Sequence, residues 1–554
     1  MTPREHNIRE LERREFDVLI VGGGINGAVS AAALAAQGAS VALIDAGDFA
    51  SGSSQESSNL AWGGFKYLET GEIGLVRKLC ASRNRLIRAY PSSVQEIRFF
   101  VSIEDGFRWN RLFIYLSAVF YWMIGGCFTR APRLLSARDI ATEEPIVAPL
   151  GPGGVEYSDA FFVDSDARFT FGFVRRAMDR DAVAVNYMRS LGGKRIDGFW
   201  HTRARDEIAG SERVIRSRVL INATGPHVDD HNALTQEATA HRHVFSKGVH
   251  LIVPQVMASH RVLTFFADDG RLFFVIPLGS VSCIGTTDTR VTTLPTIVTS
   301  MDRQFILDNI NRRLRLPKPL CERDIIAERC GVRPLAVQSN TITDGRDFVA
   351  LSRKHAVEVD VGNRHISIFG GKLTDCLNVG DEIVAAARPL GIEIPKESHR
   401  WYGEPEESAR AAFFDRAKSI ELDALTSKLS TEPLSARLWR RYGGTAFTLL
   451  DEIQRDPHMA DVVIEGADYL RCELGYAARR EMIVKLEDFL RRRGNLALTM
   501  RNGDIRKTAG LLEACQILFG EQAQEKLDEY FSASPVALQS NSSAGQSQAT
   551  SRRA

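Results

Sequence analysis

Apolar and polar positions near the start of the chain follow the order strand, glycine turn, helix, strand. The unbroken apolar run at 16–21, FDVLIV, predicts a buried strand. The stretch GGGINGAVSAAALAAQG at 22–38 predicts a turn that opens an alanine-rich helix and ends at Gly38. The run SVALIDA at 40–46 predicts a second strand, so these residues together read as a βαβ unit with a parallel sheet. The Ser- and Gly-rich segment 48–70 then predicts a loop that enters a helix.

The rest of the chain divides into a strand-rich middle and a helical C-terminal part. Residues from about 151 to 300 alternate apolar runs with turns. A glycine pair then opens another predicted helix at 372–391, which returns the chain to the first unit. From Ser532 onward the sequence is rich in Ser, Gln and Ala, a composition typical of disorder. We expect an α/β domain at 16–390, a helical domain at 400–531 and a disordered tail at 532–554.

Composition narrows the function classes. The 554 residues carry 70 Lys and Arg against 69 Asp and Glu, a net charge of +1, which argues against a nucleic-acid-binding protein. The eight cysteines form no CxxC pair, so neither a disulfide scaffold nor a zinc ribbon is expected, and a reducing, cytoplasmic location fits best. With so small a net charge, any recognition of an anion must be local.

Two segments bear on membranes. The N-terminus is charged up to Glu15 and has no apolar core before a cleavage site, so it does not resemble a secretory signal. The apolar segment 112–126, LFIYLSAVFYWMIGG, is shorter than the ~20 residues that span a bilayer. Two interpretations stay open, a buried helix or a helix that lies in a membrane surface, with a spanning segment the least favoured.

The glycine turn carries the first chemical signal. Gly22-x-Gly24-x-x-Gly27 follows a predicted strand and opens a predicted helix, whose N-terminal N–H groups suit a pyrophosphate. Asp45 ends the next strand, where an acid accepts hydrogen bonds from a ribose. We therefore predict a dinucleotide site.

Three features favour FAD over NAD as that dinucleotide. The long Ser-rich segment directly follows the second strand, and Asn222-Ala223-Thr224-Gly225 ends a strand in mid-chain. Gly370-Gly371-Lys372-Leu373-Thr374 ends a late strand and opens a helix, whose N-terminus could stabilise negative charge on a reduced flavin. Together these turns suit one long cofactor.

At this point the sequence resembles the FAD-dependent glycerol-3-phosphate dehydrogenases of the aerobic, membrane-associated type. The matching segments are FDVLIVGGGINGA, DFASGSSQESSNLAWGGFKYLE, SDARFTFGFVRRA, VLINATGPHVDD, KGVHLIVP, FFVIPLGSVSCIGTTDT, GVRPL, ISIFGGKLT and YLRCELGYAARREMIVKLEDFLRRRGNLAL. The resemblance implies an α/β fold: an FAD-binding Rossmann-like unit of the glutathione-reductase/DAO type, an interleaved antiparallel-sheet substrate domain and a C-terminal α-helical domain. It implies oxidation of sn-glycerol 3-phosphate to dihydroxyacetone phosphate, with hydride passing to flavin N5 and electrons to a quinone. It also implies peripheral contact with the inner face of the cell membrane, and a homodimer would be compatible with it.

The resemblance assigns site residues one at a time. Arg333, Lys372 and His250 are the expected catalytic group, with His250 near the flavin. Substrate contacts are expected from Lys66, Tyr67, Arg333, Arg353 and Lys372, because arginine pairs and a lysine suit a phosphate dianion and a reacting hydroxyl. The residues expected to hold FAD are Gly22, Gly24, Asn26, Gly27, Asp45, Ser53, Ser54, Ser57, Ser58, Gly63, Gly64, Ala223, Gly225, Gly371, Leu373 and Thr374.

One departure from the family puts the chemistry in question. Where the family usually has Lys-Leu-Ile-His-Gly-Gly, this chain has Asn59-Leu60-Ala61-Trp62-Gly63-Gly64. Tryptophan only donates a hydrogen bond, so Trp62 cannot replace the histidine as a base, and Lys372 or His250 must do so. Alternatively the enzyme acts on another small polyol phosphate, uses oxygen as acceptor, or is a flavin-binding regulatory protein without catalysis.

Three further features receive plain interpretations. His241-x-His243 lacks a third ligand at a suitable spacing, so no metal is expected. Arg491 to Arg493 read as the solvated end of a helix, with lipid or domain contact as the alternative. Cys376 is the one cysteine considered for redox sensitivity.

Overall fold

A computed structural model describes residues 2–339, 354–394, 400–428, 430 and 432–532. The chain forms two compact units, Met1–Glu404 and Pro405–Ala554, which we describe separately. The expected tail at 532–554 lies outside the described residues except for Ser532, and Arg353 also lies outside them.

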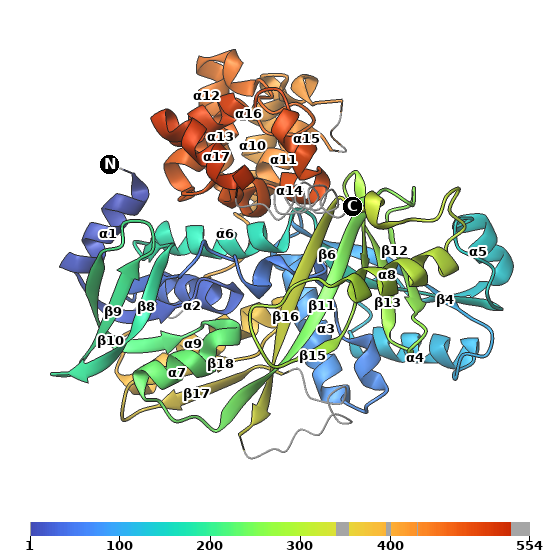
Figure 1. Cartoon of the computed structure of the whole chain (residues 1–554), viewed down its shortest axis with the longest axis horizontal. Coiled ribbons are helices and arrows are strands. Elements are labelled where there is room, and N and C mark those ends of the chain that lie inside the picture. Colours follow the sequence, from blue (N-terminus) through green and yellow to red (C-terminus); the bar gives the residue numbers. More distant parts are fainter. Residues whose placement is uncertain (1, 340–353, 395–399, 429, 431, 533–554) are drawn as a thin grey trace, which may run out of the picture. The chain divides into compact units, whose positions relative to one another are not determined.

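The first unit is built on two sheets (Figure 1). The first sheet has the order β17-β18-β10-β1-β2-β7, and its pairs from β18 to β7 are parallel, as the βαβ pattern predicts. The hairpin of β8 and β9 extends β10 in antiparallel fashion. The strands of this sheet are β1 (Glu15–Val21), β2 (Val41–Ile44), β7 (Val183–Val185), β8 (Met188–Ile196), β9 (Phe199–Asp206), β10 (Glu212–Asn222), β17 (Ala356–Asp360) and β18 (His365–Phe369).

The second sheet is antiparallel except where β12 pairs with β4, and its strands come from several separate parts of the first unit. Figure 1 shows β11 and β16 as long neighbouring strands, paired from His241–Gln338 to Ile252–Ala327. The strands of this sheet are β3 (Leu60–Ala61), β4 (Val94–Ile103), β5 (Arg133–Ser136), β6 (Gly153–Phe162), β11 (His241–Pro254), β12 (Arg261–Phe266), β13 (Leu272–Leu278), β14 (Val281–Gly285), β15 (Thr289–Val291) and β16 (Ala327–Gln338). This architecture confirms the predicted fold class.

Helices cover both sheets. The alanine-rich α2 is almost wholly buried and packs against α6 and α9, because small side chains allow close helix contact. The helices of this unit are α1 (Pro3–Arg13), α2 (Ile25–Ala36), α3 (Ile73–Ala89), α4 (Arg111–Ile124), α5 (Ala137–Glu143), α6 (Asp166–Met178), α7 (Val228–Thr235), α8 (Ser300–Arg313) and α9 (Cys376–Ala387).

The charged N-terminus, which the sequence pattern leaves outside the domain, folds as α1. Thr2 and Glu5 form a capping box at its start. Ile8 and Leu11 join the core of the first sheet, and Arg4 forms an ion pair of 2.7 Å with Asp206. Only two apolar residues, three apart, signalled this buried face in the sequence.

The second unit is helical, as predicted. Its helices are α10 (Glu407–Ser419), α11 (Leu434–Tyr442), α12 (Ala446–Arg455), α13 (Arg471–Arg480), α14 (Leu496–Thr499), α15 (Asn502–Lys507), α16 (Leu511–Phe519) and α17 (Ala523–Ser532). The interpretation of Arg491 to Arg493 as a solvated helix end is wrong, because all three are buried in a short π-helix. Arg492 pairs with Asp488 at 2.7 Å, and Arg493 donates to the carbonyl of Glu481. Internal acceptors therefore compensate the burial of Arg492 and Arg493.

Candidate functional site

The glycine turn has the backbone approach that a pyrophosphate site needs. Gly22 has φ +104°, and a Cβ there would lie 2.5 Å from the carbonyl oxygen of Ala223. A Cβ on Gly27 would lie 1.8 Å from the carbonyl oxygen of Gly22, so only glycine lets α2 begin this close to β1. Gly24 is the N-cap of α2 and carries no side chain to satisfy the first N–H groups. Apart from the N–H of Ile25, which donates to the Ser54 hydroxyl, the first N–H groups of α2 receive no cap from Gly24, an arrangement that suits an external anion.

Asp45 stabilises the turn itself. Its carboxylate accepts hydrogen bonds from the N–H of Gly23 at 2.6 Å and of Gly47 at 2.8 Å. It stands directly after β2, at the carboxyl edge of the parallel sheet, where ligands of such sheets bind. The predicted role toward a ribose stays a prediction.

The serine-rich turn, which comprises residues 51–59, packs between α2 and the second sheet. The hydroxyl of Ser53 donates to the carbonyl of Val332 at 2.7 Å, and the hydroxyl oxygen of Ser54 accepts from the N–H of Ile25 at 2.9 Å. The Ser57 N–H donates to Asp166, while Ser58 is half-buried. The turn thus brings the start of α2 close to β16.

A second glycine turn, at residues 370–374, contacts the start of the same helix, α2. The side-chain amide of Asn26 donates to the carbonyl of Gly370 at 2.9 Å, and the N–H of Gly370 donates to His243. The hydroxyl of Thr374 donates to the carbonyl of Trp62 at 3.3 Å. Segments separated by more than 300 residues therefore meet here, with Gly371 and Leu373 between the two contacts. Gly225 begins the turn after Ala223, which touches Gly22.

Lys372, Tyr67 and Trp62 form one group at this junction. The Lys372 ammonium lies 4.2 Å from the centroid of the Tyr67 ring, a cation–π contact. The rings of Tyr67 and Trp62 are 5.6 Å apart, and the Trp62 indole donates to the hydroxyl of Tyr157 at 3.3 Å. Lys66 is half-buried beside Tyr67 in the turn Phe65–Leu68.

Arg333 and His250 lie on the paired strands β16 and β11. The Arg333 guanidinium donates to the Thr286 hydroxyl at 3.1 Å and approaches Asp288 at 3.4 Å. His250 is buried, and burial together with the positive charges of Arg333 and Arg329 lowers its pKa to about 3. Its imidazole is therefore neutral at physiological pH.

Acidic groups that the sequence did not reveal hold the site segments in place. Asp159 is fully buried and accepts from the N–H of Gly63 at 3.0 Å and from Tyr121, while pairing with Arg83 at 2.8 Å. A Cβ on Gly63 would meet the Tyr121 hydroxyl at 2.1 Å. These residues sit inside ordinary strand and helix patterns, so only their three-dimensional contacts reveal the network.

A second such group lies beneath Lys372. His355 forms ion pairs with Asp375 at 2.9 Å and with Glu382 at 2.7 Å. Burial alone would lower the pKa of His355, but the hydrogen bonds to Asp375 and Glu382 outweigh it and raise the pKa to about 9. The N–H of Asp375 also donates to the carbonyl of Lys372 at 2.9 Å. This ion-pair group, in which the side chains of His355 and Asp375 are buried and that of Glu382 is exposed, therefore anchors the turn that carries Lys372.

The remaining sequence candidates have structural explanations. His241 pairs with Glu358, and His243 accepts from Gly370; in the described part of the chain no three potential metal ligands gather. Burial raises the pKa of the Cys376 thiol, which does not favour redox sensitivity.

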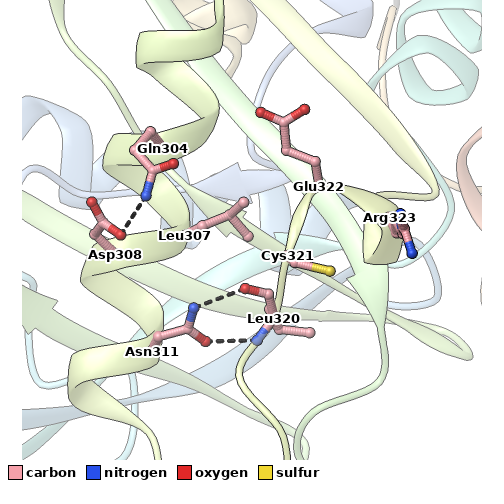
Figure 2. Close-up of a pocket in the computed structure, with 8 residues that line it drawn as sticks. All are labelled: Gln304, Leu307, Asp308, Asn311, Leu320, Cys321, Glu322 and Arg323. Atoms are coloured by element: carbon pink, nitrogen blue, oxygen red, sulfur yellow. Dashed lines mark hydrogen bonds between the residues drawn. The ribbon is translucent and has the colours of Figure 1, made fainter.

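A surface pocket lies elsewhere, between α8 and the chain segment at 320–323 (Figure 2). The Asn311 side chain donates to and accepts from the Leu320 backbone, each at 2.8 Å. Dashed lines mark these two hydrogen bonds in Figure 2. The residues that line the pocket are Gln304, Leu307, Asp308, Asn311, Leu320, Cys321, Glu322 and Arg323, none of them a predicted site residue.

The residues that meet at the glycine turns fit a long, anionic cofactor such as FAD. The helix start and the three glycines make a cradle that a Cβ would fill. Nearby, three buried side chains present polar atoms that no described residue satisfies: Oδ1 of Asn26, Nδ1 of His250, and Nε and Nη2 of Arg329. Buried polar atoms are normally paired, so a bound molecule is expected to satisfy them.

Comparison with known proteins gives consistent matches. The family model "FAD dependent oxidoreductase" matches residues 17–357, and "C-terminal domain of alpha-glycerophosphate oxidase" matches residues 411–520. Glycerol-3-phosphate dehydrogenase 2 of Mycobacterium tuberculosis is 31% identical over 510 residues, which cover 88% of this chain and 82% of that one. The aerobic glycerol-3-phosphate dehydrogenase of Staphylococcus aureus is 27% identical over 515 residues, covering 88% of both chains. The FAD complex of glycerol-3-phosphate dehydrogenase from Bacillus halodurans has a TM-score of 0.70 at 23% identity, covering 96% of this chain and 97% of that one.

Proposed function

Because the chain belongs to the family of FAD-dependent oxidoreductases, we propose that it oxidises sn-glycerol 3-phosphate to dihydroxyacetone phosphate. Relatives that span most of the chain carry the name glycerol-3-phosphate dehydrogenase. The observation that carries the proposal here is the cation–π pair of Lys372 and Tyr67, which stands at the junction of the two glycine turns. An ammonium group at that point suits a reacting hydroxyl next to a flavin.

The FAD would be held by the residues of the two turns. The α2 N-terminus beyond Gly24 would bind the pyrophosphate, and Asp45 would accept hydrogen bonds from the ribose. Asn26, Gly371 and Thr374 would line the ring end of the site, with the N-terminus of the following helix offering its dipole. Bound FAD would supply the two-electron acceptor for the hydride that leaves C2 of the substrate, and we propose a quinone as the final acceptor.

The basic side chains would bind different parts of the substrate. Arg333 carries a guanidinium that is already oriented by Thr286, and its planar fork suits a phosphate. Lys66 and Arg353 would add positive charge to the phosphate site, and Tyr67 would add a hydrogen bond. Lys372 would then face the C2 hydroxyl, where its charge favours alkoxide character as the hydroxyl proton leaves.

Lys372 is a better candidate than His250 for the proton-handling group. The pKa of His250 is lowered to about 3, so this neutral imidazole would hold a removed proton only weakly. Trp62 is also unsuitable, because its N–H donates to Tyr157 and the indole has no acceptor nitrogen. His250 would instead act as a neutral hydrogen-bonding group beside the flavin.

Anaerobic mixing of the FAD-loaded protein with sn-glycerol 3-phosphate is expected to bleach the flavin absorbance in the visible range. The reason is that substrate oxidation must transfer two electrons to the bound flavin before any acceptor is present. The measurement is a stopped-flow absorbance trace, with glycerol lacking the phosphate as the matched control. Absence of bleaching with sn-glycerol 3-phosphate would refute the proposed substrate.

The presence of Trp62, where the family usually has a histidine, motivates two alternative functions. A divergent site of this kind could oxidise another small polyol phosphate or pass electrons to oxygen, and a panel of polyol phosphates with and without oxygen separates these activities. A flavin-binding regulatory protein without catalysis is the remaining alternative. It predicts no bleaching with any member of the panel.

The proposed location is the inner face of the cell membrane, with α4 as the contact. Among the described residues, no helix has both the length and the apolar character to cross a bilayer. Yet α4 buries Ile114, Ala118 and Tyr121 and turns large apolar side chains outward. The exposed side chains on α4 are Leu112, Phe113, Leu116, Phe120 and Met123, and Trp109 lies just before the helix; each is at least 41% exposed. Such a face suits the headgroup boundary of a membrane, close to a lipid-soluble quinone.

Replacing Phe113, Leu116 and Phe120 by serine is expected to lower the fraction of enzyme that sediments with phospholipid vesicles by about tenfold or more. Each side chain would otherwise bury apolar area worth roughly 1.5–3 kcal/mol. Trp122 is left intact, because its indole donates to the carbonyl of Thr129 and supports the fold. Ile208→Ser, an exposed apolar residue on another surface, is the control. Equal sedimentation of both variants would contradict docking through α4.

A further inference from the structure

Arg329 is a buried cation inside the flavin-binding region to which the sequence assigns no role. Its side chain is 1% exposed. It lies on β16 directly opposite His250 of β11, and four residues before Arg333. Because side chains alternate along a strand, Arg329 and Arg333 share one face of the sheet with His250.

The protein satisfies this guanidinium only in part. One terminal nitrogen, Nη1, donates to the carbonyl oxygen of Ser57 and to Oδ1 of Asn59 at 3.0 Å. The nearest carboxylate, Asp166, is 3.9 Å from the same nitrogen and already accepts from the N–H groups of Ser57 and Ala167. Within the described residues, Nε and Nη2 have no acceptor. A buried arginine with unsatisfied donors is costly, so this arrangement indicates a ligand that supplies acceptors.

Asn59 joins Arg329 to the serine-rich turn. The family motif usually has a lysine where this chain has Asn59. Here the Asn59 side chain instead accepts a hydrogen bond from Arg329, which comes from a strand some 270 residues further along. Arg329 therefore places a positive charge beside the serine-rich turn, on β16.

We propose that Arg329 binds the cofactor, with its Nε and Nη2 donating hydrogen bonds to acceptor atoms of FAD. Phosphate oxygens, ring carbonyls and ring nitrogens of FAD all accept hydrogen bonds from a guanidinium. The contacts of Arg329 with Ser57 and Asn59 place it on the turn predicted to surround the cofactor. The inference depends on FAD and does not depend on which polyol phosphate is oxidised. The other source of acceptors would be the substrate phosphate, which the experiment distinguishes.

The test compares Arg329→Met, Arg329→Lys and the double variant Asn59→Lys/Arg329→Met as purified holoenzymes. FAD affinity is measured from the flavin fluorescence released on dilution without substrate, and from the rise of the melting temperature Tm with added FAD. Arg329→Met is expected to raise the Kd for FAD by tenfold or more, and Arg329→Lys by less. The double variant, which returns a cation to position 59, is expected to recover most of the affinity.

Arg98→Met is the matched control. Arg98 is also buried and pairs with Glu156 at 2.9 Å, but it lies on β4 and its other hydrogen bonds go to Ser158 and to the carbonyls of residues 130 and 131. It is expected to lower Tm while leaving the Kd for FAD unchanged. An unchanged Kd for FAD in Arg329→Met and Arg329→Lys would overturn the proposal: a raised KM for the substrate would then assign Arg329 to the substrate phosphate, and a lowered Tm alone would make it structural. If Arg329→Met does not fold, Arg329→Lys and the double variant decide the question.

Discussion

Substitution of Lys372 by methionine is expected to slow reduction of the bound flavin by substrate about a hundredfold or more. A positioned group that assists proton removal contributes typically 10²–10⁴-fold to the rate. Methionine retains an unbranched chain of similar length, so the Tyr67 ring keeps an apolar neighbour and FAD binding should be unchanged. The measurement is the rate of flavin bleaching in anaerobic stopped flow, with the substrate concentration varied to separate rate from affinity.

Two comparisons make this result specific to Lys372. Lys372→Arg keeps the positive charge but holds its proton more firmly, so it should restore electrostatic stabilisation of the alkoxide without restoring a base. Lys194→Met, at an exposed lysine on β8, should behave as the wild type. A Lys372→Met enzyme that reduces its flavin at the wild-type rate would remove Lys372 from the chemistry and return His250 to consideration.

Local sequence patterns were sufficient to predict the glycine turn at 22–27. The strand, three glycines, alanine-rich helix and following acid all lie within about thirty residues, and their chemistry depends on neighbouring backbone. The structure shows the same βαβ order and the same close approach at Gly22 and Gly27. The fold class could therefore be predicted, because periodicity and turn residues act over short distances.

The interior of the site could not be predicted in the same way. Lys372 and Tyr67 are about 300 residues apart, and only the family resemblance, not any local pattern, linked them. The partly satisfied guanidinium of Arg329 and the carboxylate of Asp159 lie in ordinary strand sequences, so their roles depend on tertiary contacts. For the same reason the charges at Arg491 to Arg493 suggested a solvated helix end, although Asp488 and the Glu481 carbonyl make the burial of Arg492 and Arg493 tolerable.

His355 leads to the second large effect, a fall in stability at alkaline pH. Its pKa in the folded protein is about 9, against 6.5 in the unfolded chain. Below pH 6.5 both states hold the proton and the stabilisation by Asp375 and Glu382 is complete. As the pH rises from 6.5 to 9 the unfolded state loses its proton first, so the free energy of unfolding should decline by about 3 kcal/mol in total.

His355→Gln tests this assignment, because glutamine keeps hydrogen-bonding capacity but does not titrate. The variant is expected to be less stable than the wild type at pH 6.5, and the difference should narrow toward pH 9 as the wild type loses its own stabilisation. Tm measured against pH for both proteins gives the two slopes, and His458→Gln provides a matched control at an exposed histidine that pairs with Asp461. If the Tm of His355→Gln falls with rising pH as steeply as the Tm of the wild type, the alkaline loss of stability comes from another group. Because Asp375 joins His355 to the turn that carries Lys372, the alkaline loss should also slow flavin reduction in the wild type over the same pH range.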